Sequence, residues 1–223
     1  MQSKESGERQ VGQYLFRQDR ENLHKALNRV LAGQGDFYDL YIVFATYYHQ
    51  STEYREAIAW MEEVAGKLEK YADAKRDAEF LVNYAHVVGN LGSQYAQIKD
   101  YYQAKEKHKK AVELYEKAGR RQEMAVGYHQ LGRVAQEERD FAEALRDYAL
   151  ALEIFLQYND KYNIEIAIEN LGILFTAWEP PDTAFASLEN SDQVKEILKA
   201  VLEKSREKNS GGEIFLRLNG ISS

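Results

Sequence analysis

The chain has 223 residues, of which 44% are hydrophobic and 29% are charged, and its formal net charge is −7. This composition is typical of a folded soluble protein and excludes a disordered chain. The acidic balance disfavours a protein that binds nucleic acid or an anionic membrane without specificity. No cysteine is present, which excludes a disulfide framework, a thiolate metal site and a cysteine nucleophile.

The sequence predicts neither membrane insertion nor secretion. No apolar run approaches the ~18 residues that a transmembrane helix requires. The polar N-terminal region lacks the apolar core of a signal peptide. We therefore expect a cytoplasmic protein, or a fragment of one.

Three helices are predicted in the N-terminal part of the chain. Residues 1–10 are polar and are expected to be disordered. A lead-in helix is expected within residues 11–36, because its apolar residues follow three- and four-residue spacing and residues 33–36 tolerate the left-handed conformation that ends a helix. Residues 38–48 are predicted to form a buried helix, and residues 54–68 form the third.

A repeat of forty residues organises the rest of the chain. A Leu-Gly pair occurs three times, with its glycine at Gly92, Gly132 and Gly172, and each step is 40 residues. The flanking residues repeat too, since Ala104 aligns with Ala144. A fixed period in this range is typical of stacked-repeat proteins, in which each unit covers the apolar face of its neighbour.

The period divides residues 37–178 into helix pairs. Asp100 and Asp140 each precede a Gln or Glu by three residues, which predicts a capping box at the start of the second helix of a pair. The first unit diverges, because Tyr54 precedes its counterpart Tyr101 by 47 residues instead of 40. The seven extra residues fall in the polar stretch from residue 69 to 77. The expected units lie near residues 37–72, 82–119, 124–159 and 164–178 onward.

The repeat pattern breaks after residue 178. Pro180 and Pro181 stand where the earlier units have a tight turn. We expect an atypical C-terminal capping helix region at residues 179–208 and a tail at residues 209–223. An apolar stretch in that tail, residues 214–216, either docks on the last helix or caps a neighbouring molecule.

The repeat resembles the tetratricopeptide repeat (TPR) in its forty-residue form. The best copy has large residues at Tyr128 and Leu131, small residues at Gly132 and Ala144, and Tyr148 on its second helix. The resemblance implies an all-α fold, an α-solenoid of antiparallel helix pairs with about nine to ten helices and a right-handed superhelical course. It also implies a protein-binding or peptide-binding scaffold that acts through a concave groove.

Two departures from the family pattern are visible. The copy around Asn90 has Val88 and His108 where larger apolar residues are usual, and the proline near the end of the second helix is missing. The unit that begins at residue 164 has a good first helix and a poor second one. The resemblance covers residues 37–178 and is strongest from residue 82 onward.

A second resemblance concerns the lead-in helix. The segment from Arg20 to Leu27, followed by residues 33–36, looks like the lead-in helix of TPR sensors fused to signalling NTPases of the STAND class. The chain itself has no Gly-rich phosphate loop. The resemblance therefore implies the C-terminal sensor region of such a protein, with an NTPase domain of the same parent chain as one partner.

In this architecture the first helix of each pair lines the groove, which gives a set of candidate binding residues. Asn90, Gln130 and Asn170 occupy the same register, and an amide both donates and accepts, so it can hold the main chain of an extended peptide. The alternative interpretation is that these amides bond to neighbouring helices. The candidate binding residues are His49, His86, Asn90, Gln97, His129, Gln130, Arg133, Glu137 and Asn170, with Asp39, Gln50, Ser93 and Glu169 as further groove-facing positions.

The sequence offers no chemistry that indicates an enzyme. No catalytic triad, HExxH motif or phosphate loop is recognisable. The histidines come from different repeats without a metal-binding spacing, so we expect no metal and no cofactor. The basic run at residues 105–110 has no aromatic platform and is expected to face solvent on a second helix, not nucleic acid. The main hypothesis is a non-catalytic sensor or adaptor scaffold, and the alternative is a self-association module that assembles through the atypical terminal repeat.

Overall fold

The regular secondary structure of the described residues is all helical. The computed structural model describes residues 2–209, and these form ten α-helices and one short 3-10 helix without a strand. This confirms the expected all-α fold built from antiparallel helix pairs. The chain divides into two compact units, unit 1 (Met1–Arg120) and unit 2 (Arg121–Ser223).

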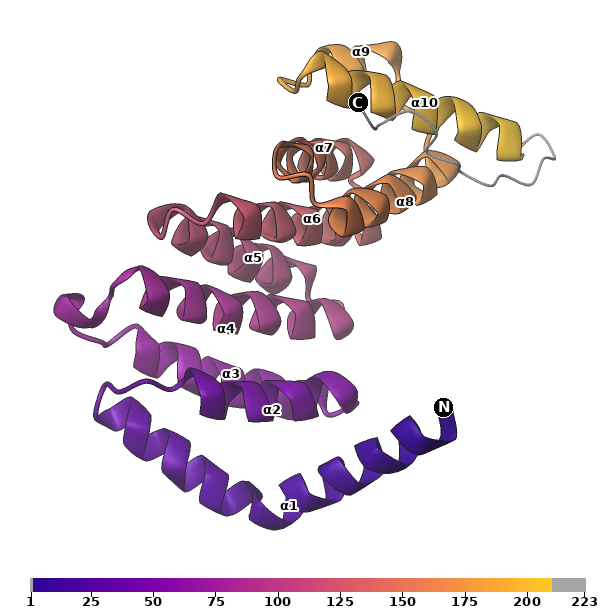
Figure 1. Cartoon of the computed structure of the whole chain (residues 1–223). Coiled ribbons are helices and arrows are strands. Elements are labelled where there is room, and N and C mark those ends of the chain that lie inside the picture. The colour runs from indigo at the N-terminus through magenta and orange to yellow at the C-terminus, as the bar shows by residue number, and fades with distance from the viewer. Residues whose placement is uncertain (1, 210–223) are drawn as a thin grey trace. The chain divides into compact units, whose positions relative to one another are not determined.

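Unit 1 contains a long first helix and two helix pairs (Figure 1). Helix α3 packs on α4, and α4 packs on α5. Its core is rich in aromatic rings, with Trp60 stacked on Tyr41 at a centroid distance of 5.4 Å and on Phe44 at 4.8 Å. The elements of unit 1 are α1 (Gln2–Ala32), α2 (Tyr38–Gln50), α3 (Tyr54–Leu68), the 3-10 helix η1 (Asp73–Lys75), α4 (Ala78–Gln97) and α5 (Tyr101–Lys117).

Unit 2 contains one regular helix pair and one modified pair. Helix α6 packs on α7, and α8 packs on both α7 and α10, so α10 supplies the second helix that the sequence pattern lacks after residue 178. The core includes Tyr148, Leu152, Phe155 and Leu171. The elements of unit 2 are α6 (Arg121–Glu137), α7 (Phe141–Gln157), α8 (Lys161–Ala177), α9 (Asp182–Ala186) and α10 (Asp192–Asn209).

The repeated glycines lie where the two helices of a pair cross. A Cβ atom added to Gly132 would stand 2.7 Å from the ring of Tyr148, and one added to Gly92 would stand 3.0 Å from His108. Both distances are too short for an alanine without movement of the neighbour. At Gly92 and Gly132 the glycine of the Leu-Gly motif therefore has a packing reason, because a methyl group there would require the neighbouring ring to move.

The turns between helices repeat every twenty residues. Lys99, Gly119, Arg139 and Asn159 all adopt positive φ, with values of 62°, 70°, 66° and 51°. In each turn the next residue donates its N–H to the carbonyl five residues back, as Asp140 does to Ala135 at 2.9 Å. This pattern ends a helix by satisfying its last carbonyl groups.

An aspartate begins the helix that follows three of these turns. The side chains of Asp100, Asp140 and Asp160 accept the N–H of the residue three positions later, at 3.1, 3.0 and 3.2 Å. These are the N-cap bonds expected for Asp100 and Asp140. In these three turns, a positive-φ residue thus ends one helix and the aspartate after it caps the next.

The structure differs from the sequence expectation at the N-terminus and contains two short helices that were not expected. The backbone is helical from Gln2, although residues 1–10 were expected to be disordered; their Gln, Lys, Glu and Arg residues favour helix and no proline interrupts them. The seven-residue insertion contains η1, and Pro181 is followed by the short helix α9. The apolar stretch at residues 214–216 lies outside the described residues.

The C-terminal end of unit 2 is anchored by one carboxylate. Glu153 of α7 accepts the backbone N–H of Ser191 at 2.9 Å and its hydroxyl at 3.0 Å, and Asn190 donates to the carbonyl of Ala149 at 3.1 Å. Helix α10 then buries Val194 and Leu198. Its opposite face exposes charged or polar residues, including Gln193, Glu196, Lys199 and Glu203.

Candidate functional site

The predicted amides occupy the same position on three first helices, α4 in unit 1 and α6 and α8 in unit 2. Asn90 is exposed, whereas Gln130 and Asn170 are partly buried. All three side chains already make hydrogen bonds within their own unit. The alternative interpretation, in which these amides bond to neighbouring helix residues, therefore accounts for part of their bonding. Their contact with a ligand stays a prediction.

In unit 1, Asn90 is tied to the preceding helix pair. Its Nδ2 donates to the hydroxyl of Tyr41 on α2 at 3.0 Å. Tyr41 is fully buried, and burial raises the pKa of its hydroxyl far above the usual value. The hydroxyl therefore stays neutral, accepts from the amide nitrogen and holds the exposed side chain of Asn90 in place.

His86 lies one turn before Asn90 and bonds to the same helix. The hydroxyl of Tyr38 lies 2.5 Å from Nδ1 of His86, and the two rings are 5.5 Å apart. Burial raises the pKa of Tyr38, so its hydroxyl stays protonated in this hydrogen bond with His86. His86 was expected on the groove side, and it is partly buried there against α2.

In unit 2, Asn170 bonds to a histidine that is not exposed. Its Nδ2 donates to Nε2 of His129 at 2.9 Å and to the carbonyl of Ile166 at 3.1 Å. Burial, with a smaller effect of the Arg133 charge, lowers the pKa of His129 to about 4. The ring is thus neutral at pH 7 and Nε2 accepts.

The placement of His129 corrects one expectation. It was predicted to face the groove, but only 7% of it is exposed and its ring lies 5.4 Å from the ring of Tyr148. The residue fills the seam between helices because it comes one position before Gln130, which turns its side chain about 100° away from the exposed stripe. From this buried position, His129 holds the side chain of Asn170 by the hydrogen bond to its Nδ2.

The remaining predicted residues lie at the surface. Arg133 donates from Nη1 to Oε1 of Gln130 at 3.1 Å, which leaves the amide nitrogen of Gln130 as the outward donor. Gln97, Glu137 and His49 are exposed. They stay predicted contact residues.

Exposed apolar residues accompany the amides, and the sequence did not single them out. Val126 is 43% exposed and lies one turn before Gln130; Ile173 is 51% exposed and lies three residues after Asn170. On α2, Ile42 and Val43 are 39% and 44% exposed. Apolar residues in a helix are normally assigned to the core, so only their position on the polar stripe could have identified them.

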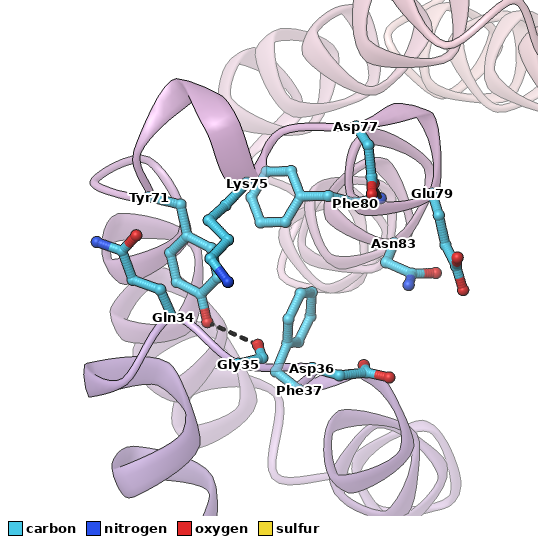
Figure 2. Close-up of a pocket in the computed structure, with 10 residues that line it drawn as sticks. All are labelled: Gln34, Gly35, Asp36, Phe37, Tyr71, Lys75, Asp77, Glu79, Phe80 and Asn83. Carbon is cyan, nitrogen blue, oxygen red and sulfur yellow. Dashed lines mark hydrogen bonds between the residues drawn. The ribbon is translucent and has the colours of Figure 1, made fainter.

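Unit 1 also holds a pocket of about 250 Å³ that the sequence did not predict (Figure 2). It lies where the loop between α1 and α2, the segment from Tyr71 to Lys75, and the start of α4 meet. The rings of Phe37 and Phe80, 6.3 Å apart, approach it from two sides. Its lining consists of Gln34, Gly35, Asp36, Phe37, Tyr71, Lys75, Asp77, Glu79, Phe80 and Asn83.

The seven-residue insertion builds one wall of this pocket. Tyr71 stacks on Phe80 at a centroid distance of 5.1 Å and donates to the carbonyl of Gly35 at 3.2 Å. Gln34 accepts the N–H of Ala72 at 3.0 Å. The departure from the forty-residue period is therefore the sequence signal that could have indicated this pocket.

The basic run on α5 differs from its expected exposure to solvent. Lys107 lies 2.8 Å from Glu62 of α3, and Lys110 pairs with Glu69. Lys110 also lies over the ring of Tyr84, 5.2 Å from its centroid. These lysines hold α5 to α3 and α4, which accounts for the run without a nucleic-acid partner.

The described residues contain no group of three or more His, Cys, Asp or Glu that could hold a metal ion. Within the same part of the chain, no helix combines the length and apolar character needed to cross a membrane.

The comparisons with known proteins agree with the repeat assignment. Residues 83–157 match the family model of the tetratricopeptide repeat, a region that includes α5, α6, α7 and most of α4. No curated protein matches the sequence. Among solved structures, the chain is similar to BtubC (BKLC) from P. vanneervenii, with a TM-score of 0.57 and 15% identity over 95% of this chain and 94% of that one. This likeness supports a helical-repeat fold.

Proposed function

We propose that the chain is a non-catalytic protein-binding scaffold, and that each unit binds a peptide segment of the partner on its own exposed stripes, α4 in unit 1 and α6 with α8 in unit 2. Tetratricopeptide repeats generally mediate protein–protein interaction, and residues 83–157 match that family. The proposal rests on one observation above the others. Each stripe presents a side-chain amide at the same position, held by its own unit.

The amides suit a peptide main chain. The nitrogens of Asn90 and Asn170 donate to Tyr41 and His129, and the amide oxygens of both residues can accept a peptide N–H. Gln130 has its oxygen engaged by Arg133 and presents its nitrogen to a peptide carbonyl. Pre-oriented groups lose little conformational entropy on binding.

The exposed apolar residues supply the side-chain contacts of the same surface. Val126 and Ile173 flank the amides of unit 2, and Ile42 and Val43 lie on α2 of unit 1. Isolated apolar residues on a polar stripe bury little area each, so the partner is held by several weak contacts and by main-chain hydrogen bonds.

The test is a combined substitution of the register amides. A pull-down from the source cell with Asn90→Ala, Gln130→Ala and Asn170→Ala together is expected to lose the partner that the unaltered chain retains. The matched control replaces the exposed residues Glu113 and Arg146 of the second helices and Glu196 of α10 by alanine, and should keep the partner. Thermal unfolding of both variants checks that they are folded. Undiminished capture by the folded amide variant would remove the stripes from the proposal.

We further propose that this scaffold is a sensor or adaptor, the sensor region of a larger signalling NTPase of the STAND class in the cytoplasm. Support comes from the lead-in segment before the array, which α1 provides: Arg20 donates to the hydroxyl of Tyr48 at 2.8 Å and pairs with Glu56. The natural reading frame upstream of the chain tests this, and a frame without a phosphate-binding loop would count against it.

Self-association through the terminal repeat is the second candidate, and one observation weighs against it. The exposed face of α10 is charged and polar, as expected for a helix that ends an array against water. Light scattering of a chain ending at Lys208 separates the two functions. A change in oligomer number relative to the full chain would favour self-association through the terminal repeat. An unchanged number would support α10 as the helix that ends the array.

A further inference from the structure

We propose that the pocket in unit 1 receives a cationic side chain, arginine or lysine, from the partner peptide. The inference rests on the proposed function and specifies the chemical class of one partner residue. It starts from the pocket's shape, the charge of its rim and its position on α4.

The size of the pocket fits one side chain. Its volume of about 250 Å³ is below the ~300 Å³ at which small-molecule sites begin. Phe37, Tyr71 and Phe80 supply aromatic walls; the ring centroid of Phe80 lies 6.3 Å from that of Phe37 and 5.1 Å from that of Tyr71. Such walls accept the methylene stem of a long side chain and attract a cation over the ring.

The charge of the pocket favours a cation. Three carboxylates line it, those of Asp36, Asp77 and Glu79, against the single ammonium of Lys75. Figure 2 shows these carboxylates on one side of the pocket, opposite Gln34 and Tyr71. The helices on either side add no competing cation, because α2 and α4 contain neither lysine nor arginine.

The start of α4 does not reverse this preference. A helix N-terminus attracts anions, but Asp77 already caps this one by accepting the N–H of Phe80 at 2.8 Å. Glu79 lies in the first turn and adds a second negative charge. The carboxylates of Asp77 and Glu79 would therefore repel an anionic ligand at this helix N-terminus.

The pocket continues the predicted binding stripe. Glu79, Asn83, His86 and Asn90 follow one another on α4 at steps of four, three and four residues, so they share one face of the helix. A peptide whose main chain meets Asn90 therefore has Glu79 and the pocket within reach along the same face. This places the cationic residue at one end of the bound segment.

The test uses defined probes and does not need the natural partner. Backbone NMR shifts of the full chain are followed as Ac-Gly-Arg-Gly-NH2 is added, with Ac-Gly-Gln-Gly-NH2 and Ac-Gly-Glu-Gly-NH2 in parallel. The arginine probe is expected to shift the resonances of Gly35, Phe37 and Phe80 at lower concentration than either other probe. Glu79→Gln should weaken the arginine probe about threefold, and Lys75→Gln should strengthen it.

The matched control is Asp73→Asn, which removes the same charge from an exposed residue of η1 that does not line the pocket. An effect of this control as large as that of Glu79→Gln would overturn the proposal. So would equal or stronger binding of the glutamine or glutamate probe. Failure here is separable from failure of the scaffold function, because the amide substitutions lie at other residues and are judged by partner capture.

Discussion

At equivalent helix crossings, the ring that packs on the glycine is a histidine in unit 1 and a tyrosine in unit 2. In unit 1, Gly92 of α4 faces His108 of α5, and in unit 2, Gly132 of α6 faces Tyr148 of α7. The partners are 40 residues apart, as the glycines are. An added Cβ atom would approach the ring to 3.0 Å in unit 1 and to 2.7 Å in unit 2. The same sequence motif thus tolerates two ring types, but the larger ring leaves less room.

The third glycine extends the comparison. Gly172 of α8 faces Val201 of α10, and its added Cβ atom would lie 3.9 Å away, an ordinary van der Waals distance. The Leu-Gly pair is present at all three crossings, but the space beside the glycine differs: it is smallest at Gly132 and largest at Gly172. Glycine at position 172 therefore reflects the repeat pattern and is not required by its present neighbour.

Each unit can be followed separately, which lets the comparison be tested. The chain has two tryptophans; Trp60 is buried in unit 1, and Trp178 stacks on Phe141 in unit 2 at 5.9 Å. Replacing one tryptophan by phenylalanine leaves the other as the fluorescence reporter of its unit. The measurements below use urea unfolding with the appropriate single-tryptophan chain.

The largest expected effect is a pH dependence of unit 2. The pKa of His129 is lowered from 6.5 to about 4 in the folded state, so the unfolded chain binds a proton that the folded chain does not. Stability is full above pH 6.5 and falls as the pH drops toward 4, by about 3 kcal/mol in total. The unfolding free energy reported by Trp178 at pH 7 and pH 4 measures this.

The control for this pH effect is His129→Gln, which keeps an acceptor for Asn170 but cannot titrate. Its loss of stability between pH 7 and 4 should be about 3 kcal/mol smaller. Carboxylates such as Asp160, whose pKa is lowered by its hydrogen bonds to Asn163, lose their contribution at lower pH in both chains. Identical pH profiles would show that His129 is not the responsible group.

Gly132→Ala should give the next largest effect. Its methyl group would overlap the ring of Tyr148, whose hydroxyl is held by Gln136 at 3.0 Å, so the ring cannot turn away freely. We expect a loss of about 2 kcal/mol, the range of overpacked cores. Combining it with Tyr148→Leu should cost less than the sum of the two single changes, and strict additivity would argue against a steric clash.

Gly92→Ala should cost less, about 1 kcal/mol. The nearest atoms of His108 lie 3.0 Å from the added methyl group, and a shift of a few tenths of an ångström relieves the contact. Trp60 fluorescence reports the unfolding. A loss equal to that of Gly132→Ala would remove the difference between the two crossings.

Gly172→Ala should have the smallest effect and the opposite sign. No neighbour is closer than 3.9 Å to the added methyl group, and alanine favours a helix over glycine by about 1 kcal/mol. We expect a gain of up to that size in the Trp178 transition. A clear loss would mean that α10 lies closer to α8 than Val201 indicates.

The repeat pattern predicted the helices and their crossings because it is a packing pattern. Gly92 and Gly132, and the caps at Asp100 and Asp140, follow from sequence spacing alone, since each depends on neighbours at a fixed offset. The role of α10 could not be predicted in this way. Its Val201 reaches α8 after an insertion, at an offset that no period describes.

The candidate binding surface was only partly accessible from sequence. The sequence placed Asn90 and Asn170 in the same register, but the hydroxyl of Tyr41 and the ring of His129 that hold them come from other helices. The pocket depends on Tyr71, an aromatic residue within a stretch that reads as polar. Contacts of this kind are set by tertiary packing, which the local pattern does not contain.

The twenty-residue spacing of the positive-φ turns has a consequence for how such a chain changes length. Lys99 and Arg139 have nearly the same φ, and each is followed by an aspartate that caps the next helix. An in-frame deletion of residues 100–139 would join Lys99 to Asp140 and recreate the same turn, with Gly92 now opposite Tyr148. Genes of this design can shorten or lengthen by whole helix pairs, because the turns before Asp100 and Asp140 have the same backbone conformation and the same cap.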